Sequence, residues 1–240
     1  PIDEAVRHLE DMIVGAAAPD RGTRLTATRL LAELIAMRGE FERSRSLIDE
    51  AEALANELGL EIFYASGVLR GAGTAAMLEG HHDAAERRLA QGAEVLRRAG
   101  DLAHLSSVLA LQAESVTAQG RHEEALALTE EAERATLSGD VDAEVNWMRV
   151  RGKTLARLGR HYEAVEFADG AAEKARPTDY LDLLASAALD RGEVMELAGR
   201  RADAVLAVQE ALAAFERKGH RVGVAAARAR LDALDAARGR

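Results

Sequence analysis

The 240-residue sequence contains no cysteine, only three prolines and few aromatic residues, which make up 3% of the chain. Without cysteine the chain has no disulfide, no thiol nucleophile and no thiolate ligand for a metal. The shortage of aromatic residues disfavours β-strands, and three prolines interrupt few helices. No apolar run approaches the roughly 18 residues that a membrane span needs, and no secretory leader opens the chain. We therefore expect a cytoplasmic protein with no membrane partner.

Positive charge is also scarce relative to negative charge. The 41 acidic residues exceed the 31 basic ones, of which three are lysines, and the formal net charge is −10. Because this balance repels a phosphate backbone, we expect no direct nucleic-acid partner. Abundant instead are alanine, with 51 residues, and leucine, with 31. Together with Glu and Arg these are strong helix formers, so the composition predicts an all-α protein.

A glycine recurs about every 40 residues along the chain. The positions are Gly39, Gly80, Gly120, Gly159 and Gly199, with spacings of 41, 40, 39 and 40 residues. A small residue (Ala, Gly or Ser) stands seven before, five after and twelve after each of them. Two antiparallel helices approach closely only where a side chain is tiny, and a glycine can end the first helix at positive φ. Each repeat is therefore predicted to be a helix, a turn and a second helix.

This pattern resembles the tetratricopeptide repeat (TPR), which places a small residue twelve positions before an Ala and a turn Gly five positions before it. Ala113, Gly120, Ala125 and Ala132 fit the pattern, as does the set from Gly152 to Ala171. The period is about 40 rather than 34 residues, and the closing Pro is missing except near Pro177, as in the longer repeats of kinesin light chains and bacterial regulators. The resemblance implies a right-handed α-α superhelix, a TPR-like solenoid of about 11 antiparallel helices.

The repeat boundaries predict one solenoid domain over residues 1–240. It comprises a half repeat at 1–15, helix pairs at 23–59, 60–100, 101–139, 140–177 and 178–219, and a capping helix at 220–240. Because the chain begins half-way through a repeat and without Met, we interpret it as a fragment of a longer protein that ends near Arg240. An unpaired first helix would expose an apolar face, so we expect self-association through it.

The segment Asp140–Gly159, with Trp147, and the segment from Phe215 through the alanine-rich last helix resemble the C-terminal repeat region of actinobacterial multidomain regulators. In those proteins a nucleotide cyclase or a transcription activator precedes a signal-transducing ATPase and such repeats. The resemblance implies a sensor or docking array in a bacterial signalling or transcription-regulatory protein.

Motifs that imitate catalytic or cofactor sites fail in their context. Gly71–Ala76 resembles a dinucleotide fingerprint but falls inside a predicted helix, and Gly152-Lys153-Thr154 lacks the glycine that a P-loop needs five residues earlier. Three of the seven histidines recur two residues after a turn Gly, one per repeat and therefore too far apart to share a metal. We expect no catalytic residue, no cofactor, no metal and no enzymatic activity.

The first helices of TPR pairs line the concave face, and their exposed positions follow from the repeat register. They predict a partner-binding surface made of Arg29, Glu33, Arg70, Thr74, Glu114, Asn146, Trp147, Arg149, Lys153, Arg157 and Glu193. Its Arg and Lys residues would form a basic track for an acidic peptide or carboxylate, unless they are ordinary helix-face charges with acidic neighbours. Trp147 is either an aromatic anchor for a partner or a plug between helices. Glu33 stands where chaperone-binding repeats have an amide, which argues against chaperone tails.

Two functions remain open at this point. The first is a non-enzymatic scaffold for a protein or peptide partner, including other domains of the same polypeptide. The second is a ligand- or peptide-sensing domain that controls an upstream ATPase, cyclase or DNA-binding domain. A sensor should contain a deep, partly apolar pocket, whereas a scaffold should present an open groove that only a polypeptide fills.

Overall fold

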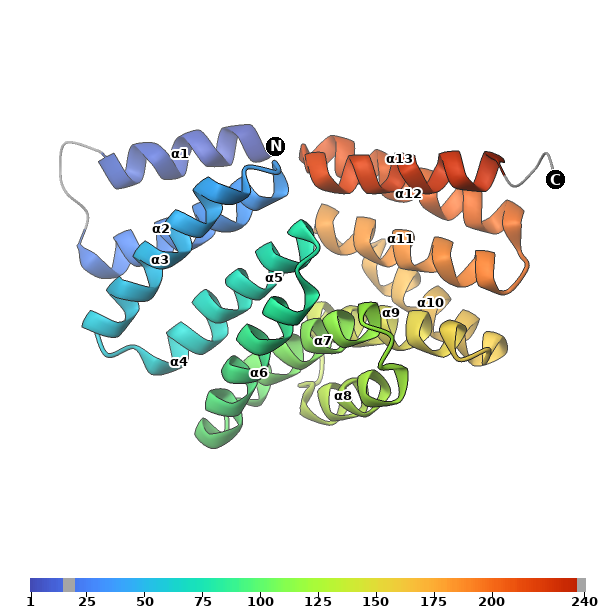
Figure 1. Cartoon of the computed structure of the whole chain (residues 1–240), viewed down its shortest axis with the longest axis horizontal. Coiled ribbons are helices and arrows are strands. Elements are labelled where there is room, and N and C mark those ends of the chain that lie inside the picture. The colour runs from blue at the N-terminus through green and yellow to red at the C-terminus, as the bar shows by residue number, and fades with distance from the viewer. Residues whose placement is uncertain (15–19, 237–240) are drawn as a thin grey trace.

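The computed structural model describes residues 1–14 and 20–236, and within them it contains 12 helices and no strand when Glu61–Glu79 is counted as one helix (Figure 1). The helices are α1 (Ile2–Val14), α2 (Arg21–Met37), α3 (Phe41–Glu57), α4 (Glu61–Phe63), η1 (Tyr64–Leu69), α5 (Arg70–Glu79), α6 (His82–Ala99), α7 (Leu102–Ala118), α8 (His122–Ala135), α9 (Val141–Arg157), α10 (His161–Ala175), α11 (Leu181–Leu197), α12 (Arg201–Lys218) and α13 (Arg221–Ala236). The predicted all-α, TPR-like class is confirmed. Residue 15 of the predicted half repeat and residues 237–240 of the predicted cap lie outside the described residues.

Local sequence signals set where the helices begin and end. Asp20, Asp101 and Asp140 accept hydrogen bonds from backbone N–H groups in the first turns of α2, α7 and α9, which satisfies donors that have no partner inside the helix. The five repeat glycines all have positive φ, between 75° and 88°. A side chain is strained in that conformation, so the glycine is what lets the chain turn into the second helix of each pair.

The recurring small residues mark the closest helix crossings. A Cβ atom added to Gly152 of α9 would lie 3.0 Å from the carbonyl oxygen of Ala164 and 3.1 Å from the nitrogen of Ala168, both in α10. At Gly192 of α11 it would lie 2.5 Å from a methyl group of Val208 in α12. The helix pairs therefore pack with their backbones almost in contact, which is possible only with such residues at the crossing.

The second repeat carries the longest glycine spacing, 41 residues. Its first helix contains a π-helical turn, η1, between α4 and α5. A π turn accommodates an additional residue without ending the helix, so this helix absorbs the longer spacing and keeps the repeat in register.

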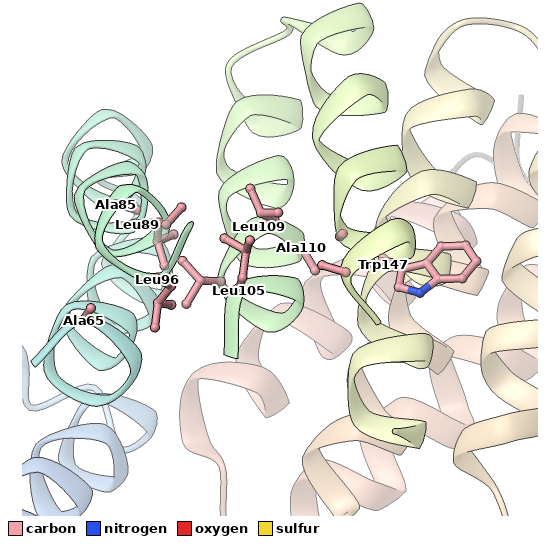
Figure 2. Packing of buried hydrophobic residues seen from close by; sticks show 12 residues of the cluster. Ala65, Ala85, Leu89, Leu96, Leu105, Leu109, Ala110 and Trp147 are labelled. Atoms are coloured by element: carbon pink, nitrogen blue, oxygen red, sulfur yellow. The ribbon is translucent and has the colours of Figure 1, made fainter. Parts of the chain in front are cut away.

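Two layers of helices form the superhelix. Consecutive inner helices α2, α5, α7, α9 and α11 contact one another, and each packs against the outer helix that follows it. The apolar core lies between these layers: Leu89 and Leu96 of α6 meet Leu105 and Leu109 of α7, and the same cluster extends to Trp147 of α9 (Figure 2).

The two ends of the superhelix meet (Figure 1). Helix α13 contacts α2, and Val222 lies 3.6 Å from the position of a Cβ on Gly39. Asp3 of α1 lies 3.7 Å from Arg38 and 3.9 Å from Arg221, so one carboxylate faces an arginine from each end. The row of inner helices therefore curves round so far that the last helix, α13, reaches α2 and completes a ring.

Helix α1 does not have the exposed apolar face that was expected of an unpaired first helix. Its Ile2, Val6 and Leu9 are buried against α2. The opposite face carries five exposed polar residues, Asp3, Glu4, Arg7, His8 and Asp11. The apolar face is buried because α1 packs against α2, and the exposed apolar side chains of α1 are Met12 and Val14 near its end. Self-association through α1 stays a prediction.

Candidate functional site: a cavity inside the ring

A cavity of about 730 Å³ lies inside the ring of inner helices. Its walls come from α2, α5, α7, α9 and α11, and residues from both ends of the chain, Pro1 and His220, also line it. Apolar side chains such as Met77 and Leu111 alternate there with charged and hydroxyl-bearing ones. Its volume falls in the range of pockets that enclose small molecules.

Most of the residues predicted for the concave face line this cavity. They are Glu33, Arg70, Thr74, Glu114, Asn146, Arg149, Lys153 and Arg157. The three others, Arg29, Trp147 and Glu193, are not among its lining residues. The repeat register thus brings residues from four inner helices, far apart in the sequence, to one surface.

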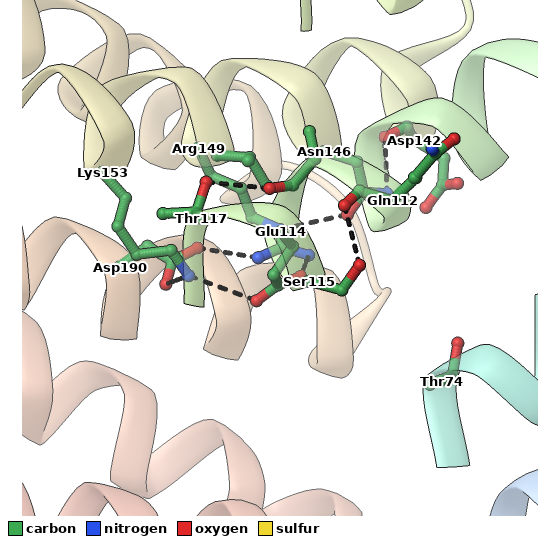
Figure 3. A network of polar contacts seen from close by, with 12 residues as sticks. Thr74, Gln112, Glu114, Ser115, Thr117, Asp142, Asn146, Arg149, Lys153 and Asp190 are labelled. Carbon is green, nitrogen blue, oxygen red and sulfur yellow. Dashed lines mark hydrogen bonds and ion pairs between the residues drawn. The ribbon is translucent and has the colours of Figure 1, made fainter. Parts of the chain in front are cut away.

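Four charged side chains form a closed network on the cavity wall (Figure 3). Arg149 of α9 donates to Glu114 of α7 and to Asp190 of α11, both at 2.7 Å. Lys153, one turn further along α9, donates to Asp190 at 2.7 Å and to Glu114 at 3.2 Å. The Nε–H of Arg149 donates to Asn146 Oδ1 at 3.1 Å. Two cations and two anions thus bind one another across three adjacent inner helices.

The ion pairs shift the pKa values of Glu114 and Lys153 in the directions that favour their charged forms. Burial alone would raise the pKa of the Glu114 carboxyl, but attraction to Arg149 and Lys153 and their hydrogen bonds lower it far below its ordinary value. Burial would lower the pKa of Lys153, and attraction to Asp190 and Glu114 raises it above its ordinary value instead. Glu114 and Lys153 are therefore charged near neutral pH, and the formal charges of the four side chains sum to zero.

The predicted basic track is consequently not a free cationic surface. Glu33 accepts from Arg29 at 2.6 Å and lies 3.4 Å from Arg70, and Glu193 pairs with Arg157 at 2.7 Å. With Arg149 and Lys153 already bound to acids, the track is a ladder of internal ion pairs. The structure therefore favours the alternative of helix-face charges with acidic neighbours, because neighbouring inner helices supply the compensating carboxylates, and docking of an acidic ligand here stays a prediction.

Trp147 belongs to the core and not to the binding surface. Its side chain is buried, its ring meets Phe167 of α10 edge-on at 6.1 Å, and the Arg151 guanidinium lies 4.5 Å from its centroid. Figure 2 shows it projecting away from the α7 side of the cluster. The anchor interpretation was therefore wrong: Trp147 is a plug between helices, packed behind the helix that bears the network.

The register argument missed the residues at the N-terminal end of the inner helices. Asp142 of α9 and Asp182 of α11 line the cavity, together with Tyr180, Lys218 and His220. Asp142 and Asp182 stand ten residues before Gly152 and Gly192, the first small residues of their repeats. Asp142 is thus one helical turn before Asn146, the first residue of α9 that was predicted for the surface. Extending the same helix face by one turn would have found both. Burial raises the pKa of Asp142 although Arg70 across the cavity opposes the shift.

Fold and site together define a TPR-like superhelical repeat protein with a ligand-sized cavity that is partly open to solvent. The chain is similar to NprR in complex with its cognate peptide NprX, with a TM-score of 0.70 and 15% identity over 99% of this chain and 67% of that one. It is similar to a Rap protein complexed with competence and sporulation factor, with a TM-score of 0.63 and 17% identity over 98% and 68% of the two chains. A Podosopora anserina protein with TPR-like repeats of the kinesin-light-chain type gives 0.54 and 15% over 82% and 96%.

These similarities establish the fold, and the chain spans about two thirds of the NprR and Rap chains. No protein-family model matches the sequence, and no curated protein matches it. Within residues 1–14 and 20–236, no helix is long and apolar enough to cross a membrane. In the same ranges no three His, Asp or Glu side chains converge as a metal site would require.

Proposed function

We propose that this chain is the ligand-sensing module of a bacterial signalling or transcription-regulatory protein, and that its cavity binds a short peptide. One observation carries the proposal: the row of inner helices curves round, with its two ends in contact, about a partly open cavity of about 730 Å³. An open scaffold that accepts a long polypeptide needs a groove with free ends, whereas a ring suits a ligand that fits within it. Two of the structurally similar proteins, NprR and Rap, were crystallised with peptides.

The role we propose is binding, without catalysis. The charged groups on the cavity wall are held by each other, as Arg149 and Asp190 are at 2.7 Å. The attraction that lowers the pKa of Glu114 and raises that of Lys153 keeps both groups charged near neutral pH, so neither exchanges protons there. These ion pairs are suited to holding the inner helices around a ligand. A change in the arrangement of these helices on binding would then transmit the signal to the other domains of the polypeptide, an upstream ATPase, cyclase or DNA-binding domain.

The test is retention of peptides from an equimolar pool of random pentapeptides, read by mass spectrometry after gel filtration. We expect the native chain to retain a subset of sequences and Ser107→Trp, which fills the cavity from α7, to retain none of them. Ser46→Trp is the matched control, because Ser46 is exposed on the outer helix α3. If the native chain retains no more peptide than Ser107→Trp does, the proposal fails.

A further inference from the structure

His220 presents an unused hydrogen-bond donor to the cavity. It lies at the start of α13, is 5% exposed, and lines the cavity. Its Nδ1 accepts a hydrogen bond from the backbone N–H of Gly223 at 3.0 Å, and its ring meets Phe215 edge-on. A backbone N–H can only donate, so Nδ1 carries no proton and the neutral ring carries it on Nε2. Burial lowers the pKa of His220, which favours this neutral form. Among the described residues none accepts from Nε2.

Asp182 presents an unused acceptor on the same side. It stands in the first turn of α11 and lines the cavity. One carboxylate oxygen, Oδ2, pairs with Lys218 at 3.0 Å. The other, Oδ1, is buried and has no hydrogen-bond partner among the described residues. A buried acceptor without a partner costs free energy, so a ligand that donates to Oδ1 gains what the free protein lacks.

The two groups belong to the same part of the cavity wall. Lys218, whose ammonium lies 3.0 Å from Asp182 Oδ2, stands two residues before His220, and all three residues line the cavity. No ion pair within 4.0 Å joins Asp182 to His220 among the described residues, since the ion pairs of Asp182 comprise only the one with Lys218. One wall of the cavity therefore carries a ring N–H and a carboxylate oxygen that have no hydrogen-bond partner among the described residues.

We propose that His220 and Asp182 form a subsite for a backbone amide of the bound peptide. The peptide carbonyl accepts from His220 Nε2, and the neighbouring N–H donates to Asp182 Oδ1. An amide is the simplest group that carries both a hydrogen-bond acceptor and a donor. It is also neutral, and the carboxylate of Asp182 already has a cationic partner in Lys218. This inference rests on the proposed peptide-binding function and names the chemistry that positions the ligand at the closure of the ring.

The subsite can be tested on the native chain by NMR of ¹⁵N-labelled histidine side chains. The probe is acetyl-Ala-Ala-Ala-amide, which offers backbone amides and no charge. We expect a saturable downfield shift of the His220 Nε2 proton, with no change at the exposed His161. A depsipeptide with ester groups in place of the amides keeps the carbonyls but lacks the N–H donors, so it should bind more weakly. Titration with acetamide separates a side-chain carboxamide from a backbone amide. No shift of His220 at saturation with acetyl-Ala-Ala-Ala-amide would overturn the proposal.

Variants test the same subsite with the pentapeptide pool. His220→Asn keeps a side-chain oxygen to cap Gly223 but removes the Nε2 donor. Asp182→Asn keeps the size and removes the charge. Each should lower the affinity of the retained peptides about tenfold, the effect of one hydrogen bond to a buried or charged group. Asp49→Asn, at an exposed carboxylate on the outer helix α3 and away from the cavity, should change it less than twofold.

The outcomes separate the two proposals. If peptides bind and Ser107→Trp abolishes binding while His220→Asn and Asp182→Asn do not weaken it, the subsite is refuted and the cavity remains the site. If the native chain retains nothing from the pool, the function itself fails. Should either variant not fold, the NMR experiment on the native chain decides.

Discussion

Arg149 and Asp190 lie 41 residues apart in the sequence, one full repeat, yet their side chains are 2.7 Å apart and both are buried. The ion pair joins α9 directly to α11, and Glu114 extends it to α7. Three repeats are thus connected by charge on the concave side as well as by apolar contacts between the layers.

Removing one charge from this network should be costly. We expect Glu114→Gln to lower the free energy of unfolding by about 3–5 kcal/mol, because Arg149 and Lys153 are left with one carboxylate between them in a buried site. The double variant Glu114→Gln/Lys153→Met, which restores neutrality, should lose much less than the sum of the two single losses. Urea unfolding of the four proteins measures the coupling.

An exposed pair provides the control for that cycle. Arg87 and Asp83 form an ion pair on α6 in which both side chains are largely exposed. Arg87→Ala should leave stability unchanged within error. Additive losses for Glu114→Gln and Lys153→Met would show that the four groups do not act as a unit.

The close crossing of α9 and α10 predicts opposite effects for two glycines. Gly152→Ala brings a methyl group against the backbone of Ala164 and Ala168, which cannot move aside, and should destabilise the protein by about 1–3 kcal/mol. Gly170→Ala in α10 meets only the flexible end of Met148 and gains helix propensity, so we expect no loss or a gain of up to about 1 kcal/mol. Thermal unfolding compares the two. Equal losses would contradict the interpretation of Gly152 as a packing residue.

The position of Trp147 can be checked by its fluorescence. As a buried residue in contact with Phe167 and Arg151, it should emit at short wavelength, resist quenching by iodide, and show no shift when peptides are added. Trp147→Ala should destabilise by about 3–5 kcal/mol. Emission typical of an exposed indole would return Trp147 to the binding surface.

Stability should depend on pH through His220. Asp182 of α11 and Lys218 of α12 are the charged groups that act on it, and burial lowers its pKa below the ordinary value of 6.5. In the unfolded chain the ring takes up a proton at a higher pH than in the folded one, so stability is complete above pH 6.5 and falls as the pH drops below it. The slope of unfolding free energy against pH between 5 and 7 should be smaller in His220→Asn than in the native chain, and an equal slope would contradict this assignment.

The sequence alone was sufficient for the fold class because the repeat is a packing pattern. Gly152 and Ala164 are small for the same physical reason in every repeat, so their spacing reports a helix pair directly. The same register placed Arg70, Glu114 and Lys153 on the concave side, where they are found.

The charge state of that surface did not follow from the register. Whether Arg149 is free or paired depends on which acid of the next inner helix reaches it, and that distance depends on the crossing geometry. The inclusion of Trp147 in the binding surface failed for a related reason, because adjacent residues of one helix can point to opposite layers. Asn146 faces the network, and the next residue, Trp147, faces the core. The contribution of His220 required the contact between the ends, which no local pattern contains.

In an open solenoid each repeat touches only its neighbours, so the terminal repeats fray first and unfolding can proceed inward from either end. The contact of Ile2 and Asp3 with Gly219 and Arg221 gives this chain no such free end. Its first and last repeats stabilise one another, and loss of either removes support from both. Unfolding should therefore begin with the separation of α13 from the N-terminal helices, and the same step would open the cavity.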